Sequence, residues 1–520
     1  MSGSHAAKPD LSDANVRIGA AGAKVQQGAA LVGITGLLAS AVIGFTGMFG
    51  TTHDFFVKSW MQNYMFVLSI SLGAFFFIFI QFLTRAAWST TVRRVAELLA
   101  GNLQWAWVGL LPIVVLWFSG GSHDAGGTHA QSEPGATQAA EVSYAPEISY
   151  SPEVSFNLAA SSIPAATGTA AAASPAAPAG GGGGGDGHGD AHGGDHGHGH
   201  AGWGPGILFP WADMEAMRSH NQAEYDLVIG KVAYLNAEFF WIRNLIYVVF
   251  WAFAARWYLK RSLAQDDSGE VGLTLTMQKW SGPMAIGFGL TITFAAFDWI
   301  MSLSPGWFST MFGVYFFCGC CTTGFSMIII ATQRLQSMGR LQGIVNAEHY
   351  QDLGKLLFAF GMVFWAYIGF SQYMLIWYAN IPEETGWFLA RQIGGWGTIS
   401  LLLLFGHFVI PFVAIISKWV KRMKWALMGA AIWMLAFAWL DLFWLVMPVI
   451  PLDIMTAKTY MEVVEAHVND TTGITNPINF TMLAGVGGIY LWMTMRRFRK
   501  YRVLAIKDPR LPEGLAFENQ

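Results

Sequence analysis

Three ionisable side chains stand inside long apolar stretches of the sequence: Asp298, His407 and Asp441. A charged group is costly in hydrocarbon and normally faces a partner or a water-filled path. The two acids share the pattern A-x-x-D-x6-P, in which a proline follows the aspartate by seven residues. A carboxyl group so placed can exchange protons with a quinol hydroxyl, a water chain or an imidazole. The pattern predicts proton-handling sites, with the alternative that each acid only satisfies an indole N–H, a backbone group or Arg243.

Further polar residues mark the same apolar stretches. Glu238 and Arg243 lie near the outer end of the fourth stretch, Gln372 and Tyr373 lie in the seventh, and Lys355 begins the seventh from the opposite side. We include these five residues, with the three above, as candidates for a proton path. For His407 a purely structural role is slightly favoured.

The composition indicates which elements must position these groups. The chain has 520 residues, of which 53% are hydrophobic and only 12% charged, whereas about a quarter of the residues of soluble proteins are charged. The hydrophobic residues gather into runs of about 20, the length of a membrane-spanning helix. Ten runs are predicted to span: Ala29–Gly50, Asn63–Leu83, Leu103–Ser119, Ala237–Leu259, Gly282–Leu303, Phe308–Thr332, Lys355–Ala379, Trp396–Ser417, Trp425–Met447 and Pro477–Met495.

The fold class is therefore predicted to be an all-α polytopic membrane protein. The runs lack the strict alternation of a β-barrel. The two A-x-x-D-x6-P segments are four spans apart and run in the same direction, which predicts two four-helix bundles, spans two to five and six to nine, with the first and last spans flanking. Each aspartate is expected about 10 Å below the outer end of its helix.

Orientation follows from Lys and Arg, which are retained on the cytoplasmic side. With ten spans, 23 of the 30 Lys and Arg residues fall on the side that holds both termini. The prediction is a cytoplasmic segment 1–28 without a cleaved signal, spans one to three in 29–119, a periplasmic insert 120–236, spans four to ten in 237–495, and a basic cytoplasmic tail 496–520.

The insert has three parts. A six-residue repeat, E-V-S-Y-A-P from Glu141, suits an extended strip that lies on a partner. An Ala/Pro/Gly-rich linker ends in Gly180–Gly185. A last tract holds histidines among glycines, which are weak candidates for metal ligands. Because poly-Gly does not preorganise a binding site, a solvated linker is the favoured interpretation. These histidines are His188, His192, His196, His198 and His200.

The sequence predicts no redox cofactor bound by this chain. One intramembrane histidine cannot supply the paired ligands of a transmembrane b-type haem, and no C-x-x-C-H motif is present. Cys318, Cys320 and Cys321 are too few for an iron–sulfur cluster and are expected to be small packing residues beside Gly319 and Gly324. A net charge of −3 gives no reason to expect nucleic acid as a partner.

Two stretches resemble a known family. Residues 297–317, F-D-W-I-M-S-L-S-P-G-W-F-S-T-M-F-G-V-Y-F-F, and Lys355–Trp387, which contains F-S-Q-Y-M-L-I-W-Y-A-N-I-P-E-E-T, look like the second NrfD-like (polysulfide-reductase-type) membrane subunit of alternative complex III. That complex is a bacterial quinol:electron acceptor oxidoreductase. The six-residue repeat and the His/Gly tract depart from the family pattern.

The resemblance implies a role within a complex. The implied partners are a multihaem cytochrome c subunit, an iron–sulfur subunit, a sister NrfD-like subunit and small cytochrome subunits, with membrane lipid around them, in the bacterial cytoplasmic membrane. Haem c and the iron–sulfur clusters belong to the partners, and the better-supported quinol pocket belongs to the sister. This chain is then a scaffold and a proton path through Asp298 and Asp441, with Gln372 and Tyr373 lining a polar cavity.

Two alternatives stay open. The chain could bind quinol itself, with Asp298 or His407 accepting the proton beneath the Trp299 and Trp307 rings. It could instead be a stand-alone secondary transporter, although such proteins usually show broken helices around a central site.

Overall fold

The computed structural model describes residues 10–119, 204–451 and 459–518. The chain divides into two units, one of residues 1–123 and 198–520 and one of residues 124–197. All described residues belong to the first unit, and their regular secondary structure is helical throughout. The six-residue repeat and the histidine tract lie outside the described residues.

Within the part of the chain that the structure describes, ten helices are long and apolar enough to cross a membrane, which confirms the predicted all-α polytopic membrane fold. The helices of the first half are α1 (Asp13–Val16), α2 (Ala23–Thr46), α3 (His53–Leu83), α4 (Arg93–Ala100), α5 (Ala106–Ser119), α6 (Met214–His220), α7 (Gln222–Ile229), α8 (Ala237–Ser268) and α9 (Val271–Trp299).

The second half continues the same architecture. Its helices are α10 (Phe312–Ser337), α11 (Ala347–Leu356), α12 (Trp365–Ala379), α13 (Pro382–Leu389), α14 (Gly394–Leu403), α15 (Ile410–Ile415), α16 (Lys418–Arg422), α17 (Lys424–Val446), α18 (Tyr460–His467), α19 (Pro477–Lys500) and α20 (Leu511–Leu515). Two π-helical segments, Leu357–Phe364 and Leu404–Val409, join α11 to α12 and α14 to α15.

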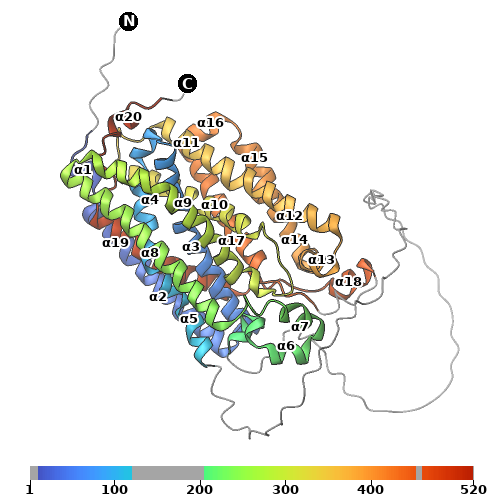
Figure 1. Ribbon diagram of the computed structural model, residues 1–520. Coiled ribbons are helices and arrows are strands. Elements are labelled where there is room, and N and C mark those ends of the chain that lie inside the picture. The colour runs from blue at the N-terminus through green and yellow to red at the C-terminus, as the bar shows by residue number, and fades with distance from the viewer. Residues whose placement is uncertain (1–9, 120–203, 452–458, 519–520) are drawn as a thin grey trace, which may run out of the picture. The chain divides into compact units, whose positions relative to one another are not determined.

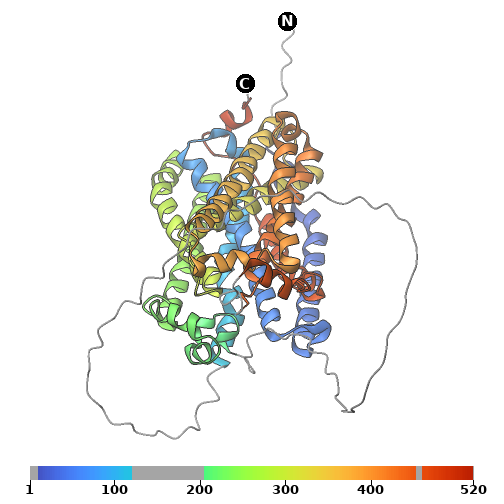
Figure 2. The same ribbon diagram turned by 90° about the vertical axis from the view of Figure 1, so that its right-hand side faces the viewer.

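Figures 1 and 2 show the long helices packed side by side, and the contacts between them correspond to the two predicted four-helix bundles. In the first bundle α3 packs on α4 and α9, and α8 packs on α4 and α9. In the second, α10 packs on α17 and on the α11–α12 helix, and the α14–α15 helix packs on α17 and on the α11–α12 helix. Helices α2 and α19 pair with each other and flank the first bundle through α3 and α4.

The bundles meet where α3 crosses α10. A Cβ atom on Gly324 would lie 2.5 Å from the Gly73 carbonyl carbon, and one on Gly73 would lie 1.8 Å from the Cys320 carbonyl oxygen. Only residues without a Cβ permit this approach. The three cysteines are buried free thiols, as the packing interpretation requires. The expectation for Gly319 was wrong, because a Cβ there would meet nothing within 4 Å.

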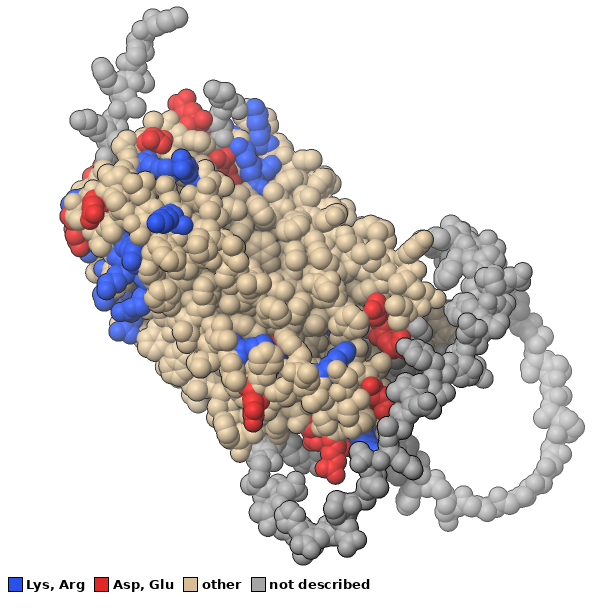
Figure 3. All heavy atoms as spheres, viewed as in Figure 1, with Lys and Arg blue, Asp and Glu red and all other residues tan. Residues whose placement is uncertain are grey.

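The two ends of the spanning helices differ in the elements they carry. Helices α1 and α20 lie at one end, the terminal face, and α6, α7 and α18 lie at the other, the insert face (Figure 1). On the side shown in Figure 3, charged side chains occupy both ends and a wide belt between them carries none. That belt has the character expected of a surface in contact with lipid.

Helix boundaries depart from the predicted runs mainly at the terminal face. The seventh span begins at Ala347 and not at Lys355, and the tenth continues to Lys500. Hydrophobic runs mark only the part of a helix inside hydrocarbon, whereas these helices continue with charged residues beyond it. Helix α9 ends at Trp299, so Asp298 lies in the last turn and not 10 Å below the end. There Ser302 Oγ donates to the Asp298 carbonyl at 2.5 Å.

Candidate functional site

Asp441 lies buried in the second bundle, on α17. Its Oδ1 accepts a hydrogen bond from the Tyr315 hydroxyl at 2.5 Å, and its Oδ2 accepts one from the Trp365 indole N–H at 3.2 Å. Among the described residues, no Lys, Arg or His forms a salt bridge with this carboxylate. Two neutral donors therefore hold Asp441, and no fixed cation compensates a negative charge there.

His407 lies on the other side of the Trp365 ring. The two rings stack with centroids 4.0 Å apart and planes 5° from parallel. His407 Nε2 donates to the Gly361 carbonyl at 3.2 Å, which also accepts from the Thr322 hydroxyl at 2.9 Å. His407 Nδ1 forms no hydrogen bond with any described residue, although the Phe437 backbone lies near it.

Both histidine contacts involve π-helical backbone. Gly361 and His407 belong to the two π-helical segments, which pack against each other. A π-helical turn changes which carbonyls the helix itself satisfies and is frequent at functional sites. The widened backbone leaves the Gly361 carbonyl available to groups from two other helices.

A cavity of about 730 Å³ opens beside Asp441. Both hydrogen-bond donors to Asp441 line it, and its wall is otherwise mainly aromatic and aliphatic. The lining residues are Phe312, Tyr315, Trp365, Ala366, Gly369, Phe370, Gln372, Tyr373, Trp387, Phe388, Arg391, Gln392, Gly397, Ser400, Leu401, Leu403, Leu404, Phe408, Trp444 and Leu445. Phe370, Leu401 and Leu404 are at least 49% exposed, so the cavity reaches the lipid-facing surface of the bundle.

Gln372 and Tyr373 line this cavity, although its wall is mainly apolar. Gln372 Nε2 donates to Ser309 Oγ at 2.8 Å, and the Tyr373 hydroxyl accepts from Gln392 Nε2 at 3.2 Å. These contacts place amide and hydroxyl groups beside aromatic surface. The cavity thus combines a few polar groups with a large apolar area, as small-molecule sites do.

Arg391 is a fully buried cation in the cavity wall. Its guanidinium donates to the carbonyls of Trp387, Trp444 and Leu445 at 2.9 to 3.1 Å and lies 3.4 Å over the Trp387 ring. Burial lowers the pKa of Arg391 from its ordinary value, yet a guanidinium keeps its charge. Carbonyls at the ends of α13 and α17 stabilise it, as expected of a cation at helix C-termini.

The matching acid of the first bundle has a different environment. Arg243 Nε and Nη2 donate to the two carboxylate oxygens of Asp298, each at 2.8 Å, and the Tyr247 hydroxyl donates at 2.7 Å. Arg243 Nη1 donates to the Tyr234 carbonyl, and its guanidinium lies 3.9 Å from the Tyr234 ring centroid. The structure thus contains the contact between Asp298 and Arg243 that one of the two interpretations of this acid named.

The remaining predicted residues do not join either acid. Lys355 is half-exposed and pairs with Asp352 at 2.7 Å near the terminal face. Glu238 is exposed in the first turn of α8. Gln372 and Tyr373 therefore line one cavity, and Asp441 and His407 lie behind its wall, in contact with the lining residues Tyr315 and Trp365. Asp298 lies with Arg243 in the other bundle, and Lys355 and Glu238 lie apart from both acids.

No family model matches the chain, and no curated protein sequence matches it either. The resemblance to NrfD-like subunits thus stays a prediction. Among residues 10–119, 204–451 and 459–518, no group of three His, Cys, Asp or Glu side chains is arranged to hold a metal ion.

Three contributors to the site were missed in the sequence. Tyr315 and Trp365 were not singled out because the chain holds 15 tyrosines and 23 tryptophans, and Arg391 was not singled out because it lies outside the ten predicted runs. The A-x-x-D motif identified Asp441 but not the residues that donate hydrogen bonds to it. Tyr315 and Trp365 belong to other helices than Asp441, so only the packing of the helices shows that their O–H and N–H groups reach the carboxylate.

A buried ionic cluster at the terminal face was also missed. Arg94 donates to Glu97 at 2.9 Å and to Asp266 at 2.8 Å, and Arg93 pairs with Glu97 and Asp508. The sequence interpretation used both arginines only to assign orientation. The cluster ties α4, the end of α8 and the C-terminal segment together, which identifies it as a structural clasp.

Proposed function

We propose that this chain is the cofactor-free membrane subunit of a bacterial quinol:electron acceptor oxidoreductase of the alternative complex III type. It lies in the cytoplasmic membrane with both termini in the cytoplasm, and its partners carry haem c and iron–sulfur clusters. The two four-helix bundles, the quoted motifs and the lack of a second histidine beside His407 in the ten predicted runs support this proposal.

Within that complex Asp441 handles the proton. The observation that carries this assignment is a buried carboxylate whose hydrogen-bond donors among the described residues are Tyr315 and Trp365, both of which line a cavity that reaches the lipid-facing surface. Protonation of Asp441 breaks no ion pair. Protonation of Asp298 would leave Arg243 as an uncompensated buried cation, so Asp298 serves instead as a structural anchor.

The test compares two near-isosteric variants, Asp441→Asn and Asp298→Asn, in the assembled complex. Asp441→Asn should lower quinol-dependent turnover and coupled proton release about 100-fold, the lower range for losing a general acid or base, with subunit composition unchanged. Asp298→Asn should reduce the amount of assembled complex while leaving turnover per complex near wild type. Wild-type turnover and proton stoichiometry in assembled Asp441→Asn complex would overturn the assignment.

Membership of a complex has its own test. Gentle detergent extraction of the tagged chain should recover subunits with c-type haem absorbance and the electron paramagnetic resonance signals of iron–sulfur clusters. Recovery of the chain as a pure, haem-free species that retains a transport activity would instead favour the secondary transporter.

A second candidate function is that the chain itself binds the quinol. The 730 Å³ cavity favours it, because a volume of 300 to 1,000 Å³ with apolar walls and a few polar groups is typical of small-molecule sites. A quinol ring against Trp365 would place a hydroxyl near Tyr315, which leads to Asp441. The exposed Phe370, Leu401 and Leu404 would accommodate the isoprenoid tail.

Neighbouring leucines on α14 provide the test of this second candidate. Leu401 lines the cavity whereas Leu402 does not, and both are about half-exposed. Leu401→Trp should block entry and raise the KM for quinol about tenfold, while Leu402→Trp leaves it unchanged. An equal KM in the two variants assigns the quinol site to another subunit.

A further inference from the structure

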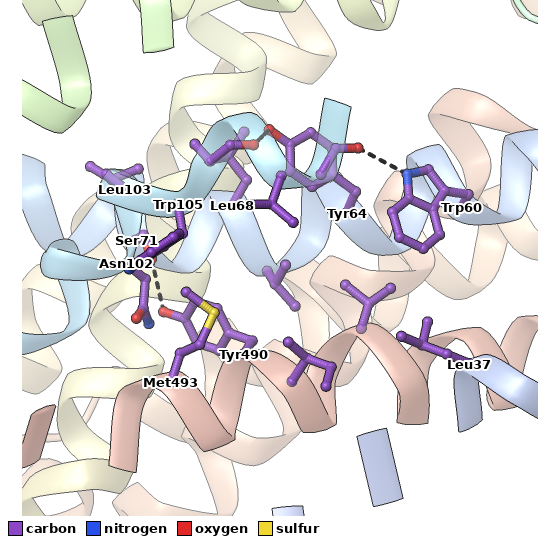
Figure 4. A pocket seen from close by; sticks show the side chains of 16 residues that line it. Leu37, Trp60, Tyr64, Leu68, Ser71, Asn102, Leu103, Trp105, Tyr490 and Met493 are labelled. Atoms are coloured by element: carbon purple, nitrogen blue, oxygen red, sulfur yellow. Dashed lines mark hydrogen bonds between the residues drawn. The ribbon is translucent and has the colours of Figure 1, made fainter. Parts of the chain in front are cut away.

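A second, narrower cavity lies outside the site described above, between the α2–α19 pair and the first bundle. Its volume is about 170 Å³. Figure 4 shows Tyr490 and Met493 of α19 on one side, facing Tyr64 and Leu68 of α3. Trp105 and Val108, also in its lining, are 49% and 41% exposed. We call it the flanking slot, and it opens to the lipid-facing surface.

The flanking slot runs along the helices and is apolar over most of its length. Its lining residues on α3 extend from Trp60 to Ser71, about 16 Å at 1.5 Å per residue. The Trp60 indole donates to the Gly109 carbonyl and the Tyr64 hydroxyl to the Ala106 carbonyl, at 3.0 and 2.8 Å. Because their polar atoms are satisfied by backbone, these side chains present hydrocarbon and ring faces to the slot.

Polar groups gather only at the end toward the terminal face. There Ser71 Oγ and the Tyr490 hydroxyl are 2.9 Å apart, and Asn102 Nδ2 donates to Thr494 Oγ1 at 2.6 Å. Arg497 donates to the Asn102 amide oxygen. The polarity of the slot therefore changes along its axis as that of a phospholipid does, from hydrocarbon to headgroup.

The same end carries cations without acidic partners. Arg496, Arg497, Arg499 and Lys500 occupy the last two turns of α19. Among the described residues, none of these four forms a salt bridge with a carboxylate. Basic groups at the end of a groove between spanning helices are typical of sites for anionic lipid headgroups.

We infer that the flanking slot binds one anionic phospholipid, with an acyl chain along α3 and its phosphate at Arg497. A guanidinium and a phosphate form charge-assisted, bidentate hydrogen bonds. The acceptors of Arg497 and Arg499 among the described residues are neutral amide and carbonyl oxygens, and a phosphodiester would supply the negative charge that these oxygens do not. The acyl chain fills the contact between the α2–α19 pair and the first bundle. The bound lipid then holds the flanking pair in place.

The experiment uses the purified, delipidated full-length protein together with any subunits that copurify. Binding of dioleoylphosphatidylglycerol and of dioleoylphosphatidylcholine is measured by native mass spectrometry and by the shift in thermal unfolding midpoint. The phosphatidylglycerol should bind at least tenfold more tightly. Arg497→Gln should abolish that preference, since a hydrogen bond to a charged group accounts for about a tenfold change in affinity, and Arg497→Lys should restore part of it.

Two matched controls separate the headgroup from the chain. Arg334→Gln removes an exposed cation from the last turn of α10, which does not line the slot, and should leave the preference intact. Val108→Trp should obstruct the slot and weaken retention of the lipid, whereas Leu111→Trp, one turn further along α5 and outside the lining, should not.

Several outcomes overturn the inference. If the wild type binds the two lipids equally, the slot does not recognise an anionic headgroup. If Arg497→Gln keeps the preference for phosphatidylglycerol, Arg497 does not contact the phosphate. If the purified wild type carries only a quinone or detergent in place of phospholipid, and Val108→Trp loses that molecule, then the slot has a different occupant.

Discussion

Arg243 and Asp298 form a bidentate ion pair that is buried between α8 and α9, with both N···O distances at 2.8 Å. The equivalent acid of the second bundle, Asp441, has two neutral donors and forms no salt bridge with any described residue. Because the surrounding A-x-x-D-x6-P pattern is the same, the difference comes from the neighbouring helix. One acid is compensated within the fold, and the other is left able to change its charge.

Removal of one partner of the ion pair should destabilise the first bundle. Arg243→Met leaves the Asp298 carboxylate buried and uncompensated, and we expect a loss of about 3–5 kcal/mol in the free energy of unfolding. The double variant Arg243→Met/Asp298→Leu should recover most of that loss because no charge remains. Unfolding by denaturing detergent, followed by circular dichroism, measures both.

Arg256→Met is the control for this prediction. Arg256 lies on the same helix but is exposed, and its nearest acceptor is Gln104 Oε1 at 3.5 Å. The unfolding free energy should then change by less than about 0.5 kcal/mol, as for most surface substitutions. If Arg243→Met and Arg256→Met have equal effects, the ion pair is not what stabilises the bundle.

A pH-dependent contribution to stability should come from Glu224, at the insert face. Burial raises the pKa of Glu224, against the opposing effects of the Asn221 side chain and of Lys231. The native state therefore keeps a proton that the unfolded chain loses above about pH 4.3. Because the unfolded state then binds fewer protons, this contribution favours folding below that pH and is lost as the pH rises through the native pKa.

Glu224→Gln removes the titrating group but keeps its size. The thermal unfolding midpoint of the variant should exceed that of the wild type at pH 7 and match it near pH 4. Asp226→Asn, which changes an exposed acid on the same helix, should shift the midpoint equally at both pH values. If the difference in unfolding midpoint between the wild type and Glu224→Gln is the same at both pH values, Glu224 is not the titrating group.

The fold could be predicted from the sequence because a membrane imposes one strong constraint, namely about 20 apolar residues per span. The repeated aspartate motif also predicted the two bundles. The π-helical segments at Gly361 and His407 could not be predicted, since no residue pattern distinguishes them from the α-helix on either side. They decide which carbonyl His407 contacts.

The candidate site was predictable only in part. Asp441, Gln372 and Tyr373 were selected because polar residues are rare in spans, and all three lie at or beside the cavity. Arg391 follows the seventh span, where sequence alone indicates an exposed loop, but the end of α17 and the Trp387 ring bury it. Such burial depends on contacts between segments more than 50 residues apart in the chain.

The crossing of α3 and α10 offers a test of how the two bundles are joined. Gly324 and Gly319 lie on the same helix, but only Gly324 contacts the other bundle. Gly324→Ala would place a methyl group 2.5 Å from the Gly73 backbone, so we expect a loss of about 1–3 kcal/mol in the free energy of unfolding, the usual cost of overpacking. Gly319→Ala meets open space and should raise the free energy of unfolding by up to about 1 kcal/mol because alanine has the better helix propensity.

Opposite signs for the two substitutions, measured in the same denaturing-detergent titration, are the expected result. Equal and small effects would mean that the helices can separate at Gly324 without loss of stability, and that contacts elsewhere along α3 and α10 hold the bundles together.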